Sequence, residues 1–510
     1  MKSWVVRVRN ERGVALPLAL FVLVSLSAFI LAFLSMGGME PQVSRNLSDS
    51  SQARYAAEAG LEAAFDTLAS APVAGTGSWS DLLSKNAVTG SNPAAHWLTA
   101  ANGAATTLPG LAATFGTYTV QIRNDSVAAD QSLTGVVPEL GVTNADNNGV
   151  VIVTATGTYN GVTRQIQAAM RRLTLPPFPA AFSMPGAQTD IGLSNNNGRI
   201  DGQDYVYQCT AKCTDPDPTK QTWDYVVNSD QSKMKYGLAV QPGNQQNLDP
   251  VTTYEANVET LINKNISNVT GKSQLGGASA VNGANTVAPD SSLGGLITRP
   301  SRDGLDTETT PKVLDDFLTN LQKFSTTKVL QSSLSCAQPD GNGVPVGIWM
   351  TGNSSDPSKP TLSGCVNQTL DLGDRNNPKL VYFRGDRDPS SSFAGVVTDG
   401  QPIKGAGILI VEDGDFRVRN QFDWDGVVIV TGRYVTFWWE NSSKGSVNGA
   451  AVSNETMWNE SGNSMGVGAS GTLYDALFDG ANATNIRYSQ QMLNIVQRQL
   501  LFRMTTWREI

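Results

Sequence analysis

The sequence contains a single histidine, His96, and only four cysteines. A Ser-His-Asp or Cys-His catalytic arrangement would have to use His96, which we interpret as an ordinary loop residue beside Trp97. The chain also lacks a basic surplus: its net charge is −8 at pH 7, whereas nucleic-acid binding requires a basic surface. We therefore expect no catalytic activity, no cofactor and no nucleic-acid partner.

Charged residues make up only 16% of the chain and aromatic residues 7%, whereas 49 residues are glycine. This composition argues against a long helical bundle and favours a β-rich architecture with many turns. At 510 residues the chain is long enough for two or three domains of roughly 100–200 residues each.

The longest apolar run lies near the N-terminus, where residues 14–36 carry no charge. A helix of this length measures roughly 35 Å, enough to cross a hydrocarbon core of about 30 Å, and the basic residues before it would stay in the cytoplasm. A 3-4 spacing then continues, so we predict one helix over 14–70 with a transmembrane segment at 14–36. Its second half has a weakly apolar face made of Val43, Leu47, Ser50, Arg54, Ala57, Leu61, Ala64 and Leu68.

Two simpler N-terminal segments fit this pattern less well. A secretory signal peptide would have a shorter apolar core followed by Ala-x-Ala, and a plain anchor would not need the second helical half. Gly37, Gly38 and Pro41 stand between the halves. In a helix interior glycine costs about 1 kcal/mol and proline about 3 kcal/mol, which predicts a kink or a melted turn at Met36–Pro41. A simple helix break at the membrane surface is the alternative.

Two segments carry a resemblance to a known family. Arg12-Gly13 before the apolar run resembles the site that prepilin peptidase cuts, and Ala56–Ala64 (AAEAGLEAA) resembles a segment of PilX-type minor pilins. The resemblance implies cleavage between Gly13 and Val14, methylation of Val14, and a role as a structural subunit of a type IV pilus.

One departure from the family pattern indicates where in the filament the subunit would stand. Major pilins carry Glu at the fifth mature position, where it pairs with the N-terminal amine of a neighbour, but here that position is Leu18. A buried amine without its partner is costly. A tip or initiating subunit, with no subunit inserted above it, does not need that Glu. Pro17 is tolerated because the first turn of a helix needs no N–H donor there.

The resemblance also implies partners and a location. The chain would lie in the bacterial inner membrane with its head in the periplasm, meet prepilin peptidase, and then move to the pilus tip at the cell surface. There it would contact other minor pilins and the major pilin through its helix, together with a PilY-type tip adhesin. It would prime assembly and support adhesion, aggregation or twitching. The alternatives are a type II secretion minor pseudopilin and, in another class, a membrane-anchored polysaccharide-active enzyme.

The fold class that we expect is α+β, with a leader over 1–13, the pilin helix over 14–70, an antiparallel β domain over 71–175 and a head over 176–510. Residues 71–110 read as a surface loop. Period-2 alternation predicts strands over 117–122, 150–156 and 162–170, with a hairpin turn at Asn160-Gly161. The apolar face of this sheet should lie on the second half of the helix. Pro176–Pro179 marks the domain boundary.

The head has short strand patterns between Gly, Asn and Asp turns, which predict stacked rungs and hence a parallel β-solenoid; an antiparallel sandwich is the alternative. This pattern also resembles the C-terminal half of long PilX-type proteins. Helices are predicted over 254–262 and 313–324, and a terminal helix with an apolar stripe from Tyr488 to Leu500 should cover the solenoid's flank or open end. The strand candidates are 190–193, 198–200, 205–207, 238–240, 347–350, 380–383, 407–411, 416–418, 426–430, 435–439 and 446–452.

The cysteines form two local pairs, Cys209/Cys213 and Cys336/Cys365. In a chain led across a membrane we expect two disulfides, because two distant pairs without a nearby histidine make a poor zinc site. A weak calcium candidate has oxygen ligands at alternate positions before a glycine, but it lacks the closing Glu, and we interpret it as an Asn/Gly turn. Its ligands would be Asn144, Asp146 and Asn148.

Paired carboxylates occur in the head, and a glycosidase needs two of them about 5–10 Å apart. We interpret these as turn residues: Glu412/Asp413/Asp415, Asp423/Asp425 and Asp386/Asp388. The triplet Arg384-Gly385-Asp386 spells an integrin-binding motif, and we interpret it as a turn as well. The consecutive Trp438 and Trp439 must point to opposite faces of a strand, so one is inside and the other is outside or covered.

Co-expression of the chain with a prepilin peptidase should shorten it to a methylated Val14 terminus, which mass spectrometry of the intact protein would detect. An unprocessed Met1 terminus under conditions where a known prepilin is cut would contradict the interpretation of Gly13 as the cleavage position.

Overall fold

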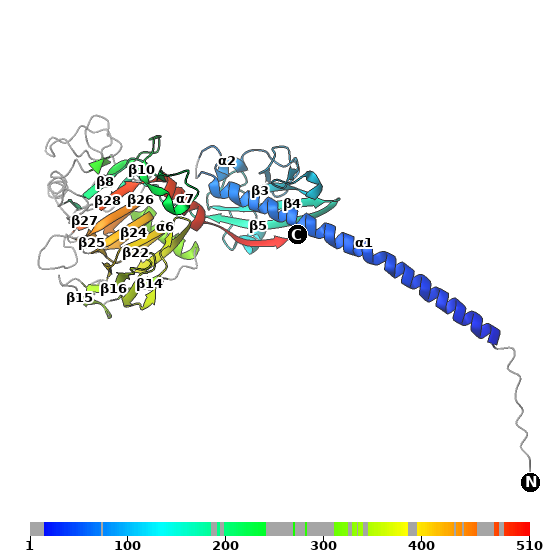
Figure 1. Cartoon of the computed structure of the whole chain (residues 1–510). Helices are drawn as coiled ribbons and strands as arrows, with labels where there is room; N and C mark the ends of the chain where they lie inside the picture. Colours follow the sequence, from blue (N-terminus) through cyan, green and yellow to red (C-terminus); the bar gives the residue numbers. More distant parts are fainter. Residues whose placement is uncertain are drawn as a thin grey trace, which may run out of the picture. The chain divides into compact units, whose positions relative to one another are not determined.

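The computed structural model shows an α+β chain that divides into two compact units (Figure 1). The first comprises the residues up to Arg171 together with Met504–Ile510, and the second comprises Arg172–Arg503. The structure describes residues 15–72, 75–184, 191–193, 198–240, 269–270, 281–282, 311–324, 329–333, 335–339, 345–385, 395–432, 435–440, 443–455, 474–478 and 484–510.

Helix α1 (Ala15–Ser70) is one continuous 56-residue helix. The expected melted turn at Met36–Pro41 is therefore wrong: the chain remains helical through Pro41. A proline inside a helix removes one backbone hydrogen bond and crowds one carbonyl. The long helical stretches on both sides outweigh that local cost.

The sheet of the first unit is antiparallel. Its centre is β3 (Thr117–Asn124), β4 (Val150–Tyr159) and β5 (Val162–Arg172), so all three predicted strands are confirmed. The turn between β4 and β5 has φ of 46° at Asn160 and 81° at Gly161, as a two-residue hairpin of the predicted kind requires.

Small residues bring α1 into close contact with β4. Ala53, Ala56 and Ala57 are fully buried, and Gly157 of β4 lies against them. A Cβ atom on Gly157 would stand 2.1 Å from the Ala53 carbonyl oxygen and 2.3 Å from the Ala57 nitrogen. The helix can approach the sheet this closely only because position 157 has no side chain.

This contact confirms that the sheet covers the second half of the helix and corrects the predicted face. Ala57, Leu61, Ala64 and Leu68 are buried as expected, whereas Val43, Leu47 and Arg54 are exposed. From Ala53 onward the buried face is occupied by the chain's own sheet.

The C-terminal segment differs from the prediction. Helix α7 (Gln490–Leu500) is followed by strand β29 (Phe502–Glu509), which pairs with β5. The Ile510 amide donates to the Gln165 carbonyl at 3.1 Å, and Arg508 donates to the Gln167 side chain at 2.7 Å, so the strand runs antiparallel to β5. Residues 504–510 thus belong to the first unit rather than to the head, and they cover what would otherwise be an exposed sheet edge.

The second unit consists mainly of two parallel sheets, and the chain alternates between them. Each strand pairs with the strand two positions along the chain, in parallel, which an antiparallel sandwich would not do. One sheet contains β20 (Asn377–Arg384), β22 (Ile403–Glu412), β24 (Gln421–Gly432), β26 (Lys444–Glu455) and β28 (Thr484–Tyr488). The other contains β21 (Gly395–Gly400), β23 (Phe416–Val418), β25 (Val435–Trp439) and β27 (Tyr474–Phe478).

Strands from the start of the second unit add to both sheets, next to β27 and β28. β7 (Ile191–Leu193) pairs with β27, and β8 (Gly198–Asp201) pairs with β28. Every strand candidate in the head overlaps an observed strand. The remaining candidates are matched by β9 (Tyr205–Ala211), β11 (Tyr236–Val240) and β16 (Pro345–Gly352).

Two helices were predicted inside the head. The one over 313–324 is confirmed as α6 (Pro311–Phe324), whereas 254–262 lies outside the described residues. The terminal helix α7 lies against β20, β22, β24 and β26, so it covers the flank of the stack.

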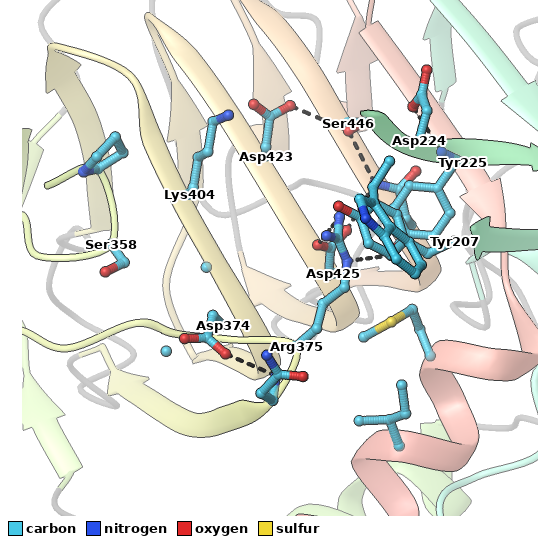
Figure 2. A pocket seen from close by; sticks show the side chains of 18 of the residues that line it. Tyr207, Asp224, Tyr225, Ser358, Asp374, Arg375, Lys404, Asp423, Asp425 and Ser446 are labelled. Carbon is cyan, nitrogen blue, oxygen red and sulfur yellow. Dashed lines mark hydrogen bonds and ion pairs between the residues drawn. The ribbon is translucent and has the colours of Figure 1, made fainter. Parts of the chain in front are cut away.

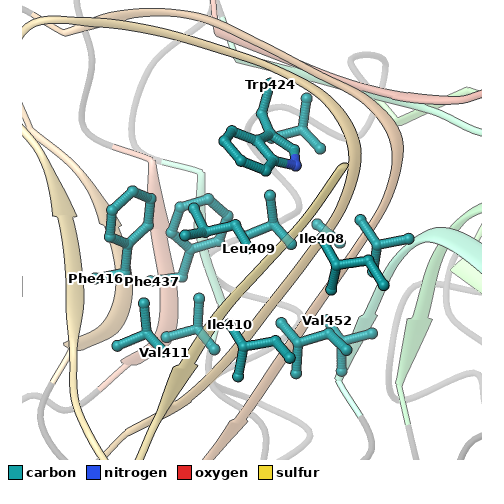
Figure 3. Close-up of a cluster of buried hydrophobic side chains, with 14 of the residues drawn as sticks. Ile408, Leu409, Ile410, Val411, Phe416, Trp424, Phe437 and Val452 are labelled. Atoms are coloured by element: carbon teal, nitrogen blue, oxygen red, sulfur yellow. The ribbon is translucent and has the colours of Figure 1, made fainter. Parts of the chain in front are cut away.

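The core between the two sheets is aromatic and aliphatic (Figure 3). The rings of Phe416 and Phe437, on neighbouring strands, stack with their centroids 5.6 Å apart. Trp439 is fully buried in this core, whereas Trp438 is half-buried under the guanidinium of Arg417, 4.0 Å from its ring centroid. The two tryptophans thus point to opposite faces, as predicted.

Gly157→Ala should destabilise the first unit by about 1–3 kcal/mol, because the new methyl group would overlap the backbone of α1. Hydrogen exchange of the β3–β5 amides in the full chain would measure this. Thr163→Ala, on an exposed position of β5, is the control and should leave exchange unchanged. Equal protection in both variants would show that the helix does not pack this closely.

Candidate functional site

The first candidate site is the N-terminal half of α1. The large apolar side chains from Leu16 to Leu34 are all at least half exposed, from 51% at Ile30 to 74% at Leu16. By length and composition, Leu16–Leu34 could cross a membrane. An exposed apolar surface of this size suits a membrane anchor or a signal segment.

The predicted processing residues adjoin this segment. Gly13 and Val14 lie outside the described residues, so cleavage there stays a prediction. Leu18, at the position where major pilins carry Glu, has a 64% exposed side chain on the apolar half of the helix.

The predicted calcium ligands form a turn before β4. Asp146 accepts from the amides of Gly149 and Val150, at 2.8 and 3.1 Å, and Asn148 Oδ1 accepts from Val150 at 2.9 Å. Asn144 Oδ1 accepts from the hydroxyl of the preceding threonine. Within the described parts of the chain, no three His, Cys, Asp or Glu side chains converge as metal ligands.

Asn148 also donates to Asp125, a buried carboxylate beside this turn, at 3.0 Å. Burial raises the pKa of Asp125 to about 6, opposed by hydrogen bonds from Asn148 and Glu139.

His96 and the cysteines have structural roles. His96 is buried in the short strand β1 (His96–Trp97), and its Nδ1 lies 2.7 Å from the Lys85 carbonyl oxygen, so it is not the loop residue we expected. Residues 71–110 also contain helix α2 (Trp79–Leu83), with Trp79 buried, although most of this stretch is loop. Both disulfides, Cys209–Cys213 and Cys336–Cys365, are present.

The carboxylate groups of the head separate into two places. Glu412 accepts from the Tyr382 hydroxyl and pairs with Arg384 at 3.7 Å, and Asp413 and Asp415 are buried near it. Asp386 and Asp388 lie outside the described residues, so the structure describes the integrin-like triplet only as far as Gly385. Asp423 and Asp425 are not the turn residues that we expected: they share one face of β24, and both line a cleft.

That cleft, with a volume of about 880 Å³, is the second candidate site (Figure 2). Its floor is the outer face of the larger sheet, where the parallel register places polar residues in rows across the strands. One row is Lys404, Asp423 and Ser446; the next is Asp425, Asn448 and Arg487. The walls are the hairpin of β9 and β10 (Thr222–Val227), the loops at 356–358 and 373–376, and helix α7.

Arg375 ties one wall to the floor. Its Nη2 lies 2.6 Å from Asp425 Oδ2, its Nε donates to the Tyr225 hydroxyl at 3.2 Å, and its guanidinium stands 3.4 Å from the Tyr207 ring centroid. Burial raises the pKa of Asp425, while the charge of Arg375 and a hydrogen bond from Asn448 oppose that rise. The positive charge of Arg375 therefore stabilises the ionised form of the Asp425 carboxylate.

Sequence reasoning noticed Asp423 and Asp425 but missed the cleft. The signal that could have found it is a glycine ladder: Gly407, Gly426 and Gly449 pair in register and all have positive φ. Aligning the chain on these glycines places Asp423 beside Ser446 and Asp425 beside Asn448. The walls come from segments far away in sequence, and no local pattern indicates them.

The chain was compared with known proteins at three levels. No protein-family model matches it, and no curated protein matches it. Among solved structures, the competence-associated pilin ComZ from Thermus thermophilus matches with 10% identity and a TM-score of 0.22, over 91% of this chain and 97% of that chain.

Replacing Arg375 by Met should destabilise the second unit, by less than the roughly 3–5 kcal/mol of a fully buried pair, because Asp425 loses its cation. The pKa of Asp425 would rise further, so the loss should be greatest at neutral pH and shrink as pH falls through that pKa. Denaturant unfolding between pH 7 and pH 5 measures this. The double variant Arg375→Met/Asp425→Asn is the control and should lose the pH dependence; a loss independent of pH would contradict the coupling.

Proposed function

We propose that this protein is a PilX-type minor pilin, a non-enzymatic structural subunit of a type IV pilus. The observation that carries the proposal is α1. Its first half exposes an apolar surface able to span a membrane, and its second half packs on an antiparallel sheet of the same chain. Such a helix suits a subunit that is first held in lipid and then inserted among the helices of other pilins.

The surfaces left open on α1 indicate how neighbouring subunits would meet it. Val43 and Leu47 remain exposed between the apolar half and the packed half, and Tyr55 is 60% exposed on the far side from the sheet. Contacts with the major pilin and other minor pilins would therefore use residues 15–52 and the outer side of the helix beyond them.

A position at the tip fits two features of the chain. Leu18 supplies no carboxylate for the amine of a neighbouring subunit, and a head as long as Arg172–Arg503 is bulky to repeat along a shaft. A subunit at the tip could prime assembly, meet a PilY-type adhesin and support adhesion, aggregation or twitching motility. Before assembly it would sit in the bacterial inner membrane with its head in the periplasm, and prepilin peptidase would cut after Gly13.

We propose further that the head is a parallel β-solenoid. The support is that successive strands alternate between two sheets while each sheet pairs in parallel and in register. A type II secretion minor pseudopilin is the alternative within the same architecture. A membrane-anchored polysaccharide-active enzyme is the alternative of another class, because Asp423 and Asp425 line a cleft.

Deletion of the gene should lower the number of surface pili, and the processed chain should copurify with sheared fibres. Complementation with the wild-type gene should restore pili, whereas Gly13→Val, which places a branched residue at the cleaved bond, should not. Unchanged pilus number together with absence from the fibres would refute the proposal. Secretion defects with normal pili would favour the pseudopilin.

A further inference from the structure

We propose that the cleft of the second unit binds an uncharged oligosaccharide, including N-acetylated ones. The inference concerns the head alone and does not depend on the pilin proposal. It rests on the polar rows of the floor, an aromatic wall, a buried amide oxygen without a partner, and the charge of the lining.

The floor can hydrogen-bond to several hydroxyl groups in succession. Parallel strands lie about 4.8 Å apart, so each row places side chains at regular intervals across the cleft. Asp423 accepts from Ser446 at 3.2 Å and from Gln421 at 2.8 Å, which holds its carboxylate in place. Figure 2 shows Lys404, Asp423 and Ser446 on adjacent strands of this floor. Neighbouring acceptors and donors of this kind match the vicinal hydroxyls of a sugar ring.

The hairpin wall supplies an aromatic surface. Trp223 stacks on Tyr207 with centroids 5.6 Å apart, and Trp223 is still 47% exposed. Arg375 lies against Tyr207 and also contacts Tyr225. Because Arg375 is paired with Asp425 of the floor, it holds these two rings in place. A rigid, half-exposed indole beside polar groups suits the C–H face of a pyranose, which is apolar while its edge carries hydroxyls.

A buried group in the floor points independently to a ligand. Asn448 is only 3% exposed, and its Nδ2 donates to Asp425 at 3.0 Å and to Ser446 at 3.1 Å. Its Oδ1 has no hydrogen-bond partner among the residues described. Buried amide oxygens are rarely left unpaired. Asn448 lines the cleft, but this oxygen is itself covered, so a hydroxyl or an acetamido N–H of a ligand would satisfy it once the Asn448 side chain turns toward the cleft.

The charge of the residues that line the cleft favours uncharged over acidic sugars. Arg375 and Asp425 neutralise each other, which leaves more carboxylates than cations facing the cleft. An acidic polysaccharide would be repelled, and an uncharged chain would not. The charged lining residues are Asp224, Asp356, Asp374, Asp423 and Asp425 against Arg375, Lys404 and Arg487.

The same contacts favour binding over hydrolysis. A glycosidase needs one carboxylic acid free to donate a proton to the leaving group. Both oxygens of Asp425 are engaged, one by Arg375 and the other by Asn448. Both oxygens of Asp423 are engaged as well. We therefore expect a bound oligosaccharide to remain intact.

The test uses the full chain in detergent on an array of neutral, N-acetylated and acidic oligosaccharides, followed by calorimetric titration with the best uncharged tetrasaccharide. Trp223→Ala and Asp423→Asn should each weaken binding about tenfold or more, since a loss of 1.4 kcal/mol is tenfold in affinity. Trp507→Ala, which removes a 54% exposed tryptophan of the first unit, is the matched control and should bind as the wild type does. Circular dichroism would verify that the variants fold.

Each other outcome overturns the proposal. No binding of any uncharged oligosaccharide at millimolar concentration would remove it, and binding of acidic sugars alone would refute the charge argument. Equal affinity in the wild type and both cleft variants would place the site elsewhere. New reducing ends in the bound tetrasaccharide would show that the protein hydrolyses the sugar, which contradicts the proposal of binding alone.

Discussion

The contact between α1 and Gly157 is the constraint on which the first unit depends. Three alanines of the helix and one glycine of β4 allow the two backbones to meet with almost no side chain between them. Close packing of this kind leaves little room for the helix to slide or rotate against the sheet. One end of a 56-residue helix is thereby fixed, while the other end exposes its apolar side chains.

Local patterns in the sequence predicted the elements of both units. The period-2 strands over 117–170 and the hairpin at Asn160-Gly161 follow from side-chain alternation and from two positive φ angles, both of which are local properties. The continuous helix at Met36–Pro41 was missed because propensity counts only the cost of glycine and proline. It does not count the helical hydrogen bonds on either side that remain intact.

Arrangements that join distant segments could not be predicted in this way. β29 pairs with β5 across more than 300 residues of chain, and its sequence reads equally well as the end of a helix. The cleft likewise combines one face of β24 and β26 with a hairpin near residue 207 and a loop near residue 375. Only the floor of the cleft has a repeating sequence pattern, namely the glycines whose alignment places Asp423 beside Ser446.

The pairing of β29 with β5 makes the head an insertion within the first unit. The chain leaves that unit after Arg171 and returns to it at Met504, so the head has two covalent connections instead of one. The last strand of the N-terminal sheet is therefore synthesised only after the whole head. A ribosome that stops inside the head would release a protein with a bare sheet edge, open to proteolysis or to pairing with another chain. The sheet of the first unit is thus complete only in a chain that also contains the whole second unit.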